Sequence, residues 1–196
     1  KNGLKACGMH TLIPKLEGDS FKRMVDFQKA IGSRYLILAA LPKQNLTSMK
    51  GLQEAVKKLD ELAEKLQPHG MKIGYHCHGG DFQPAEGQIP WAVLASKTRS
   101  DVIFQLDVGN CLQGGGDYLA MLDQFAAKAV TVHLKEFGGK PGAVIGEGKI
   151  NWKEVFRICE TKAPTEWYIV EEESRKGPES LEVCRRSLQA LRKMGK

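Results

Sequence analysis

Four short runs of the sequence place imidazole, carboxylate and amine groups at the ends of apolar, β-rich segments. The four runs are Tyr75-His76-Cys77-His78, Gln105-Leu106-Asp107, His133-Leu134-Lys135 and Glu171-Glu172-Glu173. Because side chains alternate on a strand, the polar residues two positions apart in each run share one face. Carboxylates and imidazoles that converge on one point bind a divalent ion such as Mn²⁺, Zn²⁺, Co²⁺ or Mg²⁺. The runs therefore predict a metal site.

Each run also has a commoner structural interpretation. A single aspartate after an apolar strand, such as Asp107, is often a turn former or a helix cap. His133 taken alone is more often a hydrogen-bonded core histidine than a ligand. Residues 171–173 fit a solvated run of charge, and Lys135 fits a simple ion pair. Four such runs at corresponding strand ends together favour the metal site.

The elements that position these groups alternate between short β-rich runs and longer helical patterns, which is typical of βαβ units and a parallel sheet. Strands are expected at residues 4–9, 35–40, 72–78, 102–108, 129–135 and 167–171. Helices are expected at 21–31, 49–66 and 118–127, followed by two that open at Asn151 and Pro178. The longest loops, 79–90, 109–116 and 137–149, follow strands, where parallel α/β folds bind their ligands.

Composition narrows the class of protein. A chain of 196 residues with 42% hydrophobic and 27% charged residues fits one domain over 1–196. No apolar run approaches the roughly 20 residues of a membrane helix. The net charge of +6 is spread over several expected helices, which argues against nucleic acid as a partner. Five cysteines without a CxxC pair favour a reducing, cytoplasmic compartment, although the start at Lys1 without Met leaves a removed signal peptide open.

Longer motifs resemble a known family. They are GMKIGYHCHGGDF (70–82), FQLDVGNC (104–111), VTVHLKEF (130–137), VIGEGKINW (144–152) and WYIVEEE (167–173). These are similar to the sugar phosphate isomerase/epimerase family, which has the xylose isomerase-like TIM-barrel fold and shares the AP endonuclease 2-type domain. GLKACGMHT (3–11) and YLILAALP (35–42) look like the third and fourth strands of that barrel.

The resemblance implies an α/β fold of the (β/α)8 type that lacks about the first two β/α units. A complete barrel takes about 250 residues, and six strands do not close one. We therefore expect the strand beginning at Leu4 and the strand ending at Glu171 to be two edges of an open barrel.

The resemblance also implies a ligand set. Three positions match the metal ligands of the family: Asp107, His133 and Glu171. The fourth ligand is a glutamate in many members, and His76 stands in its place here. That departure leaves open whether His76, His78 or Asp81 completes the coordination. The substrate-contacting positions are His10, His78, Lys135 and Glu147.

The implied reaction is proton transfer beside the carbonyl of a ketose or keto-sugar, through an enediolate-like intermediate, by an isomerase or epimerase. Glu171 would act as ligand and base, and Lys135 would face the negative charge that develops. Two alternatives stay open: a dehydratase or lyase on the same scaffold, and a non-catalytic sugar-binding barrel. The expected partner is a small sugar, and a homo-oligomer stays open. Phosphodiester cleavage is disfavoured because the basic charge is diffuse.

Overall fold

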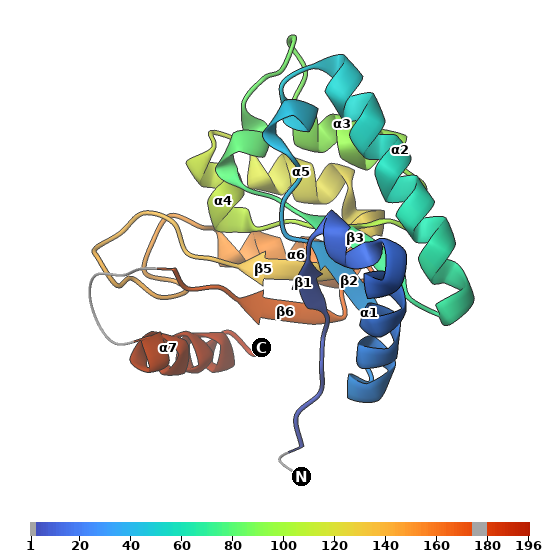
Figure 1. The fold of residues 1–196 in the computed structure, drawn as a ribbon. Helices are drawn as coiled ribbons and strands as arrows, with labels where there is room; N and C mark the ends of the chain where they lie inside the picture. Colours follow the sequence, from blue (N-terminus) through green and yellow to red (C-terminus); the bar gives the residue numbers. More distant parts are fainter. Residues whose placement is uncertain (1–2, 174–179) are drawn as a thin grey trace.

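The described part of the chain folds around six parallel strands. The structure is a computed structural model that describes residues 3–173 and 180–196. The strands are β1 (Met9–Thr11), β2 (Tyr35–Leu38), β3 (Lys72–His76), β4 (Ile103–Gln105), β5 (Thr131–Leu134) and β6 (Trp167–Val170). The first four pair in the order β1-β2-β3-β4, and the last two form a second sheet, β5-β6 (Figure 1). Every pair is parallel, as the alternation of strands and helices predicts.

The two sheets meet at residues of the predicted site. One isolated bridge joins Asp107 to His133, and the His133 amide donates to the Leu106 carbonyl at 2.9 Å. The strands therefore follow one another from β1 to β6. Among residues 3–173 and 180–196, β1 pairs only with β2 and β6 only with β5, so the described strands present two edges.

The helices lie outside the strands (Figure 1). They are α1 (Gly18–Ile31), α2 (Met49–Leu66), α3 (Pro90–Lys97), α4 (Val108–Gln113), α5 (Tyr118–Gln124), α6 (Trp152–Thr161) and α7 (Ser180–Lys193). Short 3-10 turns occur at Ile13–Leu16, Lys43–Leu46, Gln67–His69, Gly79–Phe82 and Ala126–Lys128. On α2 the buried residues Leu52, Leu59 and Leu66 recur every seven positions, so one stripe of this helix faces the core.

A small apolar cluster fills the inner side of the strands. It consists of Tyr35, Ile37, Ile103 and Val130, with Trp167 packed against it. Gly74 on β3 is part of this packing, because a Cβ at this position would lie 2.6 Å from the Ile37 side chain. These side chains lie at or near the starts of the strands. The carboxyl ends of the strands carry the polar residues.

The first strand begins later than the sequence predicts. We expected a strand over residues 4–9, but β1 starts at Met9. Met9 pairs with Leu36, and β2 itself begins at Tyr35, so residues 4–7 extend past the start of β2 and lack that neighbour. Leu4 is accordingly 89% exposed. A strand needs a paired neighbour for its backbone groups, and the apolar run alone did not provide one.

The structure also differs from the prediction at α1 and α4. α1 begins at Gly18, one turn before the expected start at Phe21, with Glu17 as its N-cap residue. The expected loop 109–116 contains most of α4. The sequence does not predict this helix, because Gly109 and the glycines at 114–116 are typical loop residues. Pro178, expected to open the last helix, lies outside the described residues.

Side chains cap the starts of three other helices. Each side chain accepts a hydrogen bond from a backbone amide three residues further on, and the three residues are Ser48, Asp117 and Asn151. Such caps satisfy amides that the first helical turn leaves without a partner.

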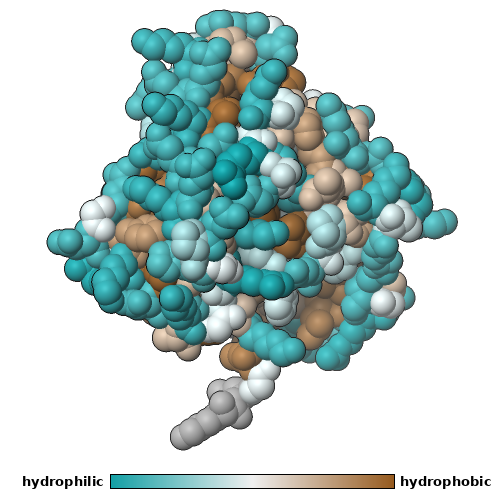
Figure 2. Space-filling view, turned by 90° about the vertical axis from the view of Figure 1, so that its right-hand side faces the viewer, coloured by the Kyte–Doolittle hydropathy of each residue, from teal (hydrophilic) through white to brown (hydrophobic). Residues whose placement is uncertain are grey.

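Hydrophilic residues cover most of the face shown in Figure 2, and exposed hydrophobic residues occupy smaller areas between them. Within the described ranges, no helix is both long and apolar enough to span a membrane.

Candidate metal centre

Four predicted ligand side chains meet at the carboxyl ends of the strands. One potential ligand atom from each of His76, Asp107, His133 and Glu171 lies within 4.8 Å of the other three. His76 ends β3, Asp107 follows β4, His133 lies in β5, and Glu171 follows β6. The parallel register places them on the same face of neighbouring strands, as the alternation of side chains predicts.

Asp107 is fully buried, and its two oxygens differ in their surroundings. Oδ1 accepts the backbone amide of Asn110 at 2.6 Å and so caps α4. Oδ2 is buried without a hydrogen-bond partner in the described part of the chain, 3.9 Å from His133 Nδ1. Burial raises the pKa of Asp107 to about 7, more than the Asn110 hydrogen bond lowers it. The capping interpretation is therefore correct for one oxygen, and the other is available to a ligand.

His76, like Asp107, is shielded from solvent. Its side chain is buried, and Nδ1 has no hydrogen-bond partner among the described residues. Burial lowers its pKa to about 3, so the ring is neutral at physiological pH. The His10 and His133 rings lie 4.8 and 4.6 Å away between centroids. A neutral imidazole is the form that binds metal ions.

His133 and Glu171 contact each other directly through Nδ1 and Oε2. Burial alone would raise the pKa of Glu171, but the hydrogen bond and charge of His133, with help from His76 and Lys135, lower it to about 2. Glu171 is therefore an ionised carboxylate beside the imidazole of His133.

This donor set fits a divalent cation. Buried polar atoms are ordinarily hydrogen-bonded, yet Asp107 Oδ2 and His76 Nδ1 have no such partner in the described chain and lie in the same cluster. Two nitrogens and two carboxylate oxygens suit Zn²⁺, Mn²⁺ or Co²⁺. The four side chains together could hold one ion.

The fourth position was open between His76, His78 and Asp81. The cluster includes His76. The His78 ring lies 5.0 Å from the His76 ring, between centroids, and His78 is exposed. The Asp81 carboxylate accepts hydrogen bonds from the Tyr75 hydroxyl at 2.9 Å and from the His78 amide at 2.7 Å, so both of its oxygens already have partners. The geometry favours His76.

Lys135 borders the cluster. Its ammonium donates to Asn110 Oδ1 at 2.9 Å and to Glu171 Oε1 at 3.4 Å, and it contacts Glu173. Lys135 is thus ion-paired, which agrees with the structural interpretation of the sequence. It also lies beside Glu171, a candidate metal ligand, as the functional interpretation requires.

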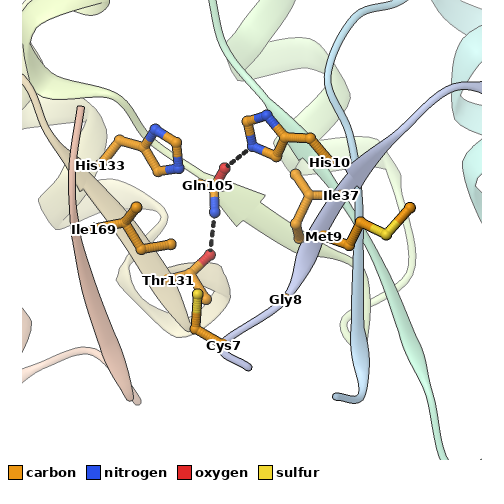
Figure 3. A pocket seen from close by; sticks show the side chains of 9 residues that line it. All are labelled: Cys7, Gly8, Met9, His10, Ile37, Gln105, Thr131, His133 and Ile169. Carbon is orange, nitrogen blue, oxygen red and sulfur yellow. Dashed lines mark hydrogen bonds between the residues drawn. The ribbon is translucent and has the colours of Figure 1, made fainter. Parts of the chain in front are cut away.

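Cavities adjoin the cluster on two sides. The inner cavity, of about 200 Å³, is lined by Cys7, Gly8, Met9, His10, Ile37, Gln105, Thr131, His133 and Ile169 (Figure 3). There the Gln105 side chain bridges His10, at 2.7 Å, and the Thr131 hydroxyl, at 2.8 Å. The outer cavity, of about 370 Å³, is lined by Lys135, Glu136, Gly138 to Ala143 and Glu171 to Glu173. A molecule in either cavity would contact the cluster.

Two predicted substrate contacts differ in their placement. His10 lies at the cluster, with its ring stacked on that of His133 at 5.2 Å between centroids. Glu147 is placed elsewhere: its carboxylate accepts Arg186 of α7 at 2.7 Å and the Val144 amide at 3.2 Å. The expected set omitted Asn110, which contacts both Asp107 and Lys135. Its signal in the sequence is its position three residues after the capping aspartate.

Comparison with known proteins identifies the family of the chain. The model of the xylose isomerase-like TIM barrel matches residues 15–194. The chain is 26% identical over 190 residues to the inosose dehydratase of Clostridium beijerinckii. The match spans 87% of this chain but only 59% of that relative. It is 24% identical to the inosose dehydratase of Clostridium perfringens, of which it covers 60%. The chain thus spans less than two thirds of these curated relatives.

Solved structures share the fold. A sugar phosphate isomerase/epimerase from Parabacteroides distasonis superposes with a TM-score of 0.83 at 20% identity, covering 96% of this chain and 72% of that one. The IolI protein, solved with a bound zinc atom, gives a TM-score of 0.69 at 17% identity, covering 87% and 66%. With this shared parallel α/β architecture and a match over residues 15–194, the chain belongs to the xylose isomerase-like TIM-barrel family.

Proposed function

We propose that this protein is a divalent-metal-dependent enzyme that moves a proton at the carbon beside the carbonyl of a small keto-sugar or keto-polyol. The ligands would be His76, Asp107, His133 and Glu171. The observation that supports this proposal most is a pair of buried atoms in one cluster of donors, Asp107 Oδ2 and His76 Nδ1, which have no hydrogen-bond partner among residues 3–173 and 180–196.

The side chains around the cluster suit this chemistry. When bound, the ion would polarise the carbonyl and the neighbouring hydroxyl of the substrate. Glu171, which stays ionised, is the candidate to remove the proton from carbon. The Lys135 ammonium, 3.4 Å from Glu171, would stabilise the negative charge of the enediolate-like intermediate.

The intermediate has two fates, which define two candidate activities. Return of the proton to carbon gives an isomer or an epimer. Loss of a hydroxyl from the next carbon, with a proton delivered to it, gives water and a carbon–carbon double bond. The relatives named inosose dehydratase support dehydration about as well as the structural neighbour named isomerase/epimerase supports the first fate.

Proton exchange tests the step that both activities share. The protein would be loaded with Zn²⁺, Mn²⁺ or Co²⁺ and incubated in D2O with D-fructose, D-tagatose and a keto-inositol, and the products would be read by NMR. Deuterium beside the carbonyl supports the proposal. A new isomer then indicates the isomerase or epimerase, and an unsaturated ketone indicates the dehydratase.

Two variants serve as controls. Asp107→Ala and His133→Ala should lose both the bound metal, measured by elemental analysis, and the exchange. Stoichiometric metal without exchange into any of these substrates would contradict the proposal and support a non-catalytic sugar-binding barrel.

A further inference from the structure

Asn110 connects three parts of the site. The side chain is only 4% exposed, on the first turn of α4. Its backbone amide donates to Asp107 Oδ1 at 2.6 Å, its side-chain Nδ2 donates to the Cys77 carbonyl at 3.1 Å, and its Oδ1 accepts Lys135 Nζ at 2.9 Å. One residue thus contacts a ligand candidate, the chain just after His76, and the lysine of the proposed reaction.

The chemistry of the partners fixes the orientation of this amide. An ammonium group can only donate hydrogen bonds, and a backbone carbonyl can only accept them. With Lys135 on one side and the Cys77 carbonyl on the other, a flipped Asn110 amide would place donor against donor and acceptor against acceptor. The side chain therefore holds its oxygen toward Lys135 in a single orientation.

Gly109 brings this turn close enough to make the contact. A Cβ at position 109 would lie 2.6 Å from the Lys135 carbonyl oxygen and 2.9 Å from Lys135 Cγ. Contacts under 3.0 Å require backbone to move, so only glycine lets α4 approach the end of β5 this closely. The first turn of α4 and Lys135 are packed directly against each other.

We infer that Asn110 is a positioning residue, whose amide holds the Lys135 ammonium beside the ligand cluster and links it to the end of β3. The inference rests on the proposed function, because it gives Lys135 the role of stabilising charge on the substrate. Glu171 and Glu173 also attract the ammonium, but carboxylates attract it from many directions, whereas the oriented amide oxygen fixes it at one place.

Chemical labelling tests the positioning without any substrate. The protein would be treated briefly with acetic anhydride, and acetylation of each lysine would be followed by mass spectrometry. Lys128, held by three hydrogen bonds to Thr98 and Arg99, is the internal reference. Asn110→Ala should raise the labelling rate of Lys135 relative to Lys128 by about fivefold, the order of one lost hydrogen bond.

Asn151→Ala is the matched control, because the Asn151 side chain also makes a hydrogen bond at the start of a helix, where it caps α6. It should leave the ratio unchanged. If Asn110→Ala does not fold, Asn110→Ser takes its place, since serine is too short to reach both partners. An unchanged ratio in a folded Asn110 variant would overturn the inference, whatever the protein catalyses.

A double-mutant cycle tests the consequence for turnover. On the substrate found by deuterium exchange, Asn110→Ala should lower kcat about tenfold with little change in KM or metal content. In a Lys135→Met background the same substitution should cost almost nothing, because its effect passes through Lys135. Equal losses in both backgrounds would contradict the inference. If the wild-type protein binds no metal, that result would contradict only the proposed function.

Discussion

The two oxygens of Asp107 have different roles in one side chain. Oδ1 stabilises the first turn of α4, and Oδ2 faces the cluster. Substitution by alanine therefore removes two interactions at once, and a loss of metal could be mistaken for a loss of fold. Substitution by asparagine separates them, because asparagine caps helices as well as aspartate does but is a poorer ligand.

We predict that Asp107→Asn loses stabilisation by metal. At a free Zn²⁺ concentration about 100 times Kd, the wild type should gain roughly 2.7 kcal/mol in unfolding free energy. The variant should gain far less, as measured by thermal unfolding with and without Zn²⁺. Asp117→Asn is the control, because Asp117 caps α5 in the same way. Equal stabilisation of both variants by Zn²⁺ would exclude Asp107 as a ligand.

The type of ligand at position 76 should set metal preference. Imidazole favours Zn²⁺ and Co²⁺, whereas carboxylate favours Mg²⁺ and Mn²⁺. His76→Glu should therefore tighten binding of Mn²⁺ relative to Zn²⁺, as measured by titration calorimetry. His78→Glu places the same group outside the cluster and should leave the relative affinities unchanged. The same metal order in the wild type and in His76→Glu would argue against coordination by His76.

At the scale of elements, the site depends on the short helix α4 and its close contact with β5. Gly109 permits that contact, since any side chain at this position meets the backbone of Lys135. Asp107 immediately precedes this helix and Asn110 lies in it. A displacement of α4 would therefore move a ligand candidate and the partner of Lys135 together.

We predict that Gly109→Ala destabilises the protein by about 1–3 kcal/mol, the range for overpacking a tight contact. Urea unfolding measures the change. Gly80→Ala is the matched control, because a Cβ at Gly80 meets nothing within 4 Å. Its effect should be within about 1 kcal/mol of zero. Equal effects of the two substitutions would mean that the α4 contact yields easily.

At the scale of the whole molecule, a polar link joins β2 to β6 near their starts, at the end opposite to the site. Glu166 accepts Arg34 at 2.9 Å and the Tyr35 hydroxyl at 2.6 Å. The Tyr35 hydrogen bond and the Arg34 charge lower the pKa of Glu166. The link connects the first sheet to the second, in addition to the bridge between Asp107 and His133.

We predict a pH-dependent effect of Glu166→Gln. A carboxylate with a lowered pKa stabilises the fold above its unfolded pKa, near 4.5, and loses that contribution as pH falls through the lower folded value. The variant should be less stable at pH 7 by at most about 1 kcal/mol, since the pair is partly exposed. The difference should shrink below pH 4. Urea unfolding at pH 7 and 3.5 would show it, with Glu64→Gln as the exposed control.

The sequence predicted most of the cluster because alternation along a strand is local. His76, Asp107, His133 and Glu171 each end or follow an apolar run, and parallel pairing aligns those ends. The place of Glu147 was not predictable in this way, because it depends on Arg186, 39 residues away on α7. The start of β1 likewise depends on where its neighbour begins, which the run 4–9 does not encode.

The position of the cluster across the boundary between the two sheets has a dynamic consequence. His76 belongs to the first sheet and Asp107 follows its last strand, whereas His133 and Glu171 belong with the second sheet, and few backbone contacts join the sheets at this level. An ion bound by all four would crosslink the sheets. A brief separation of β4 from β5 would part the ligands two from two, so the residence time of the ion would be governed by this local opening.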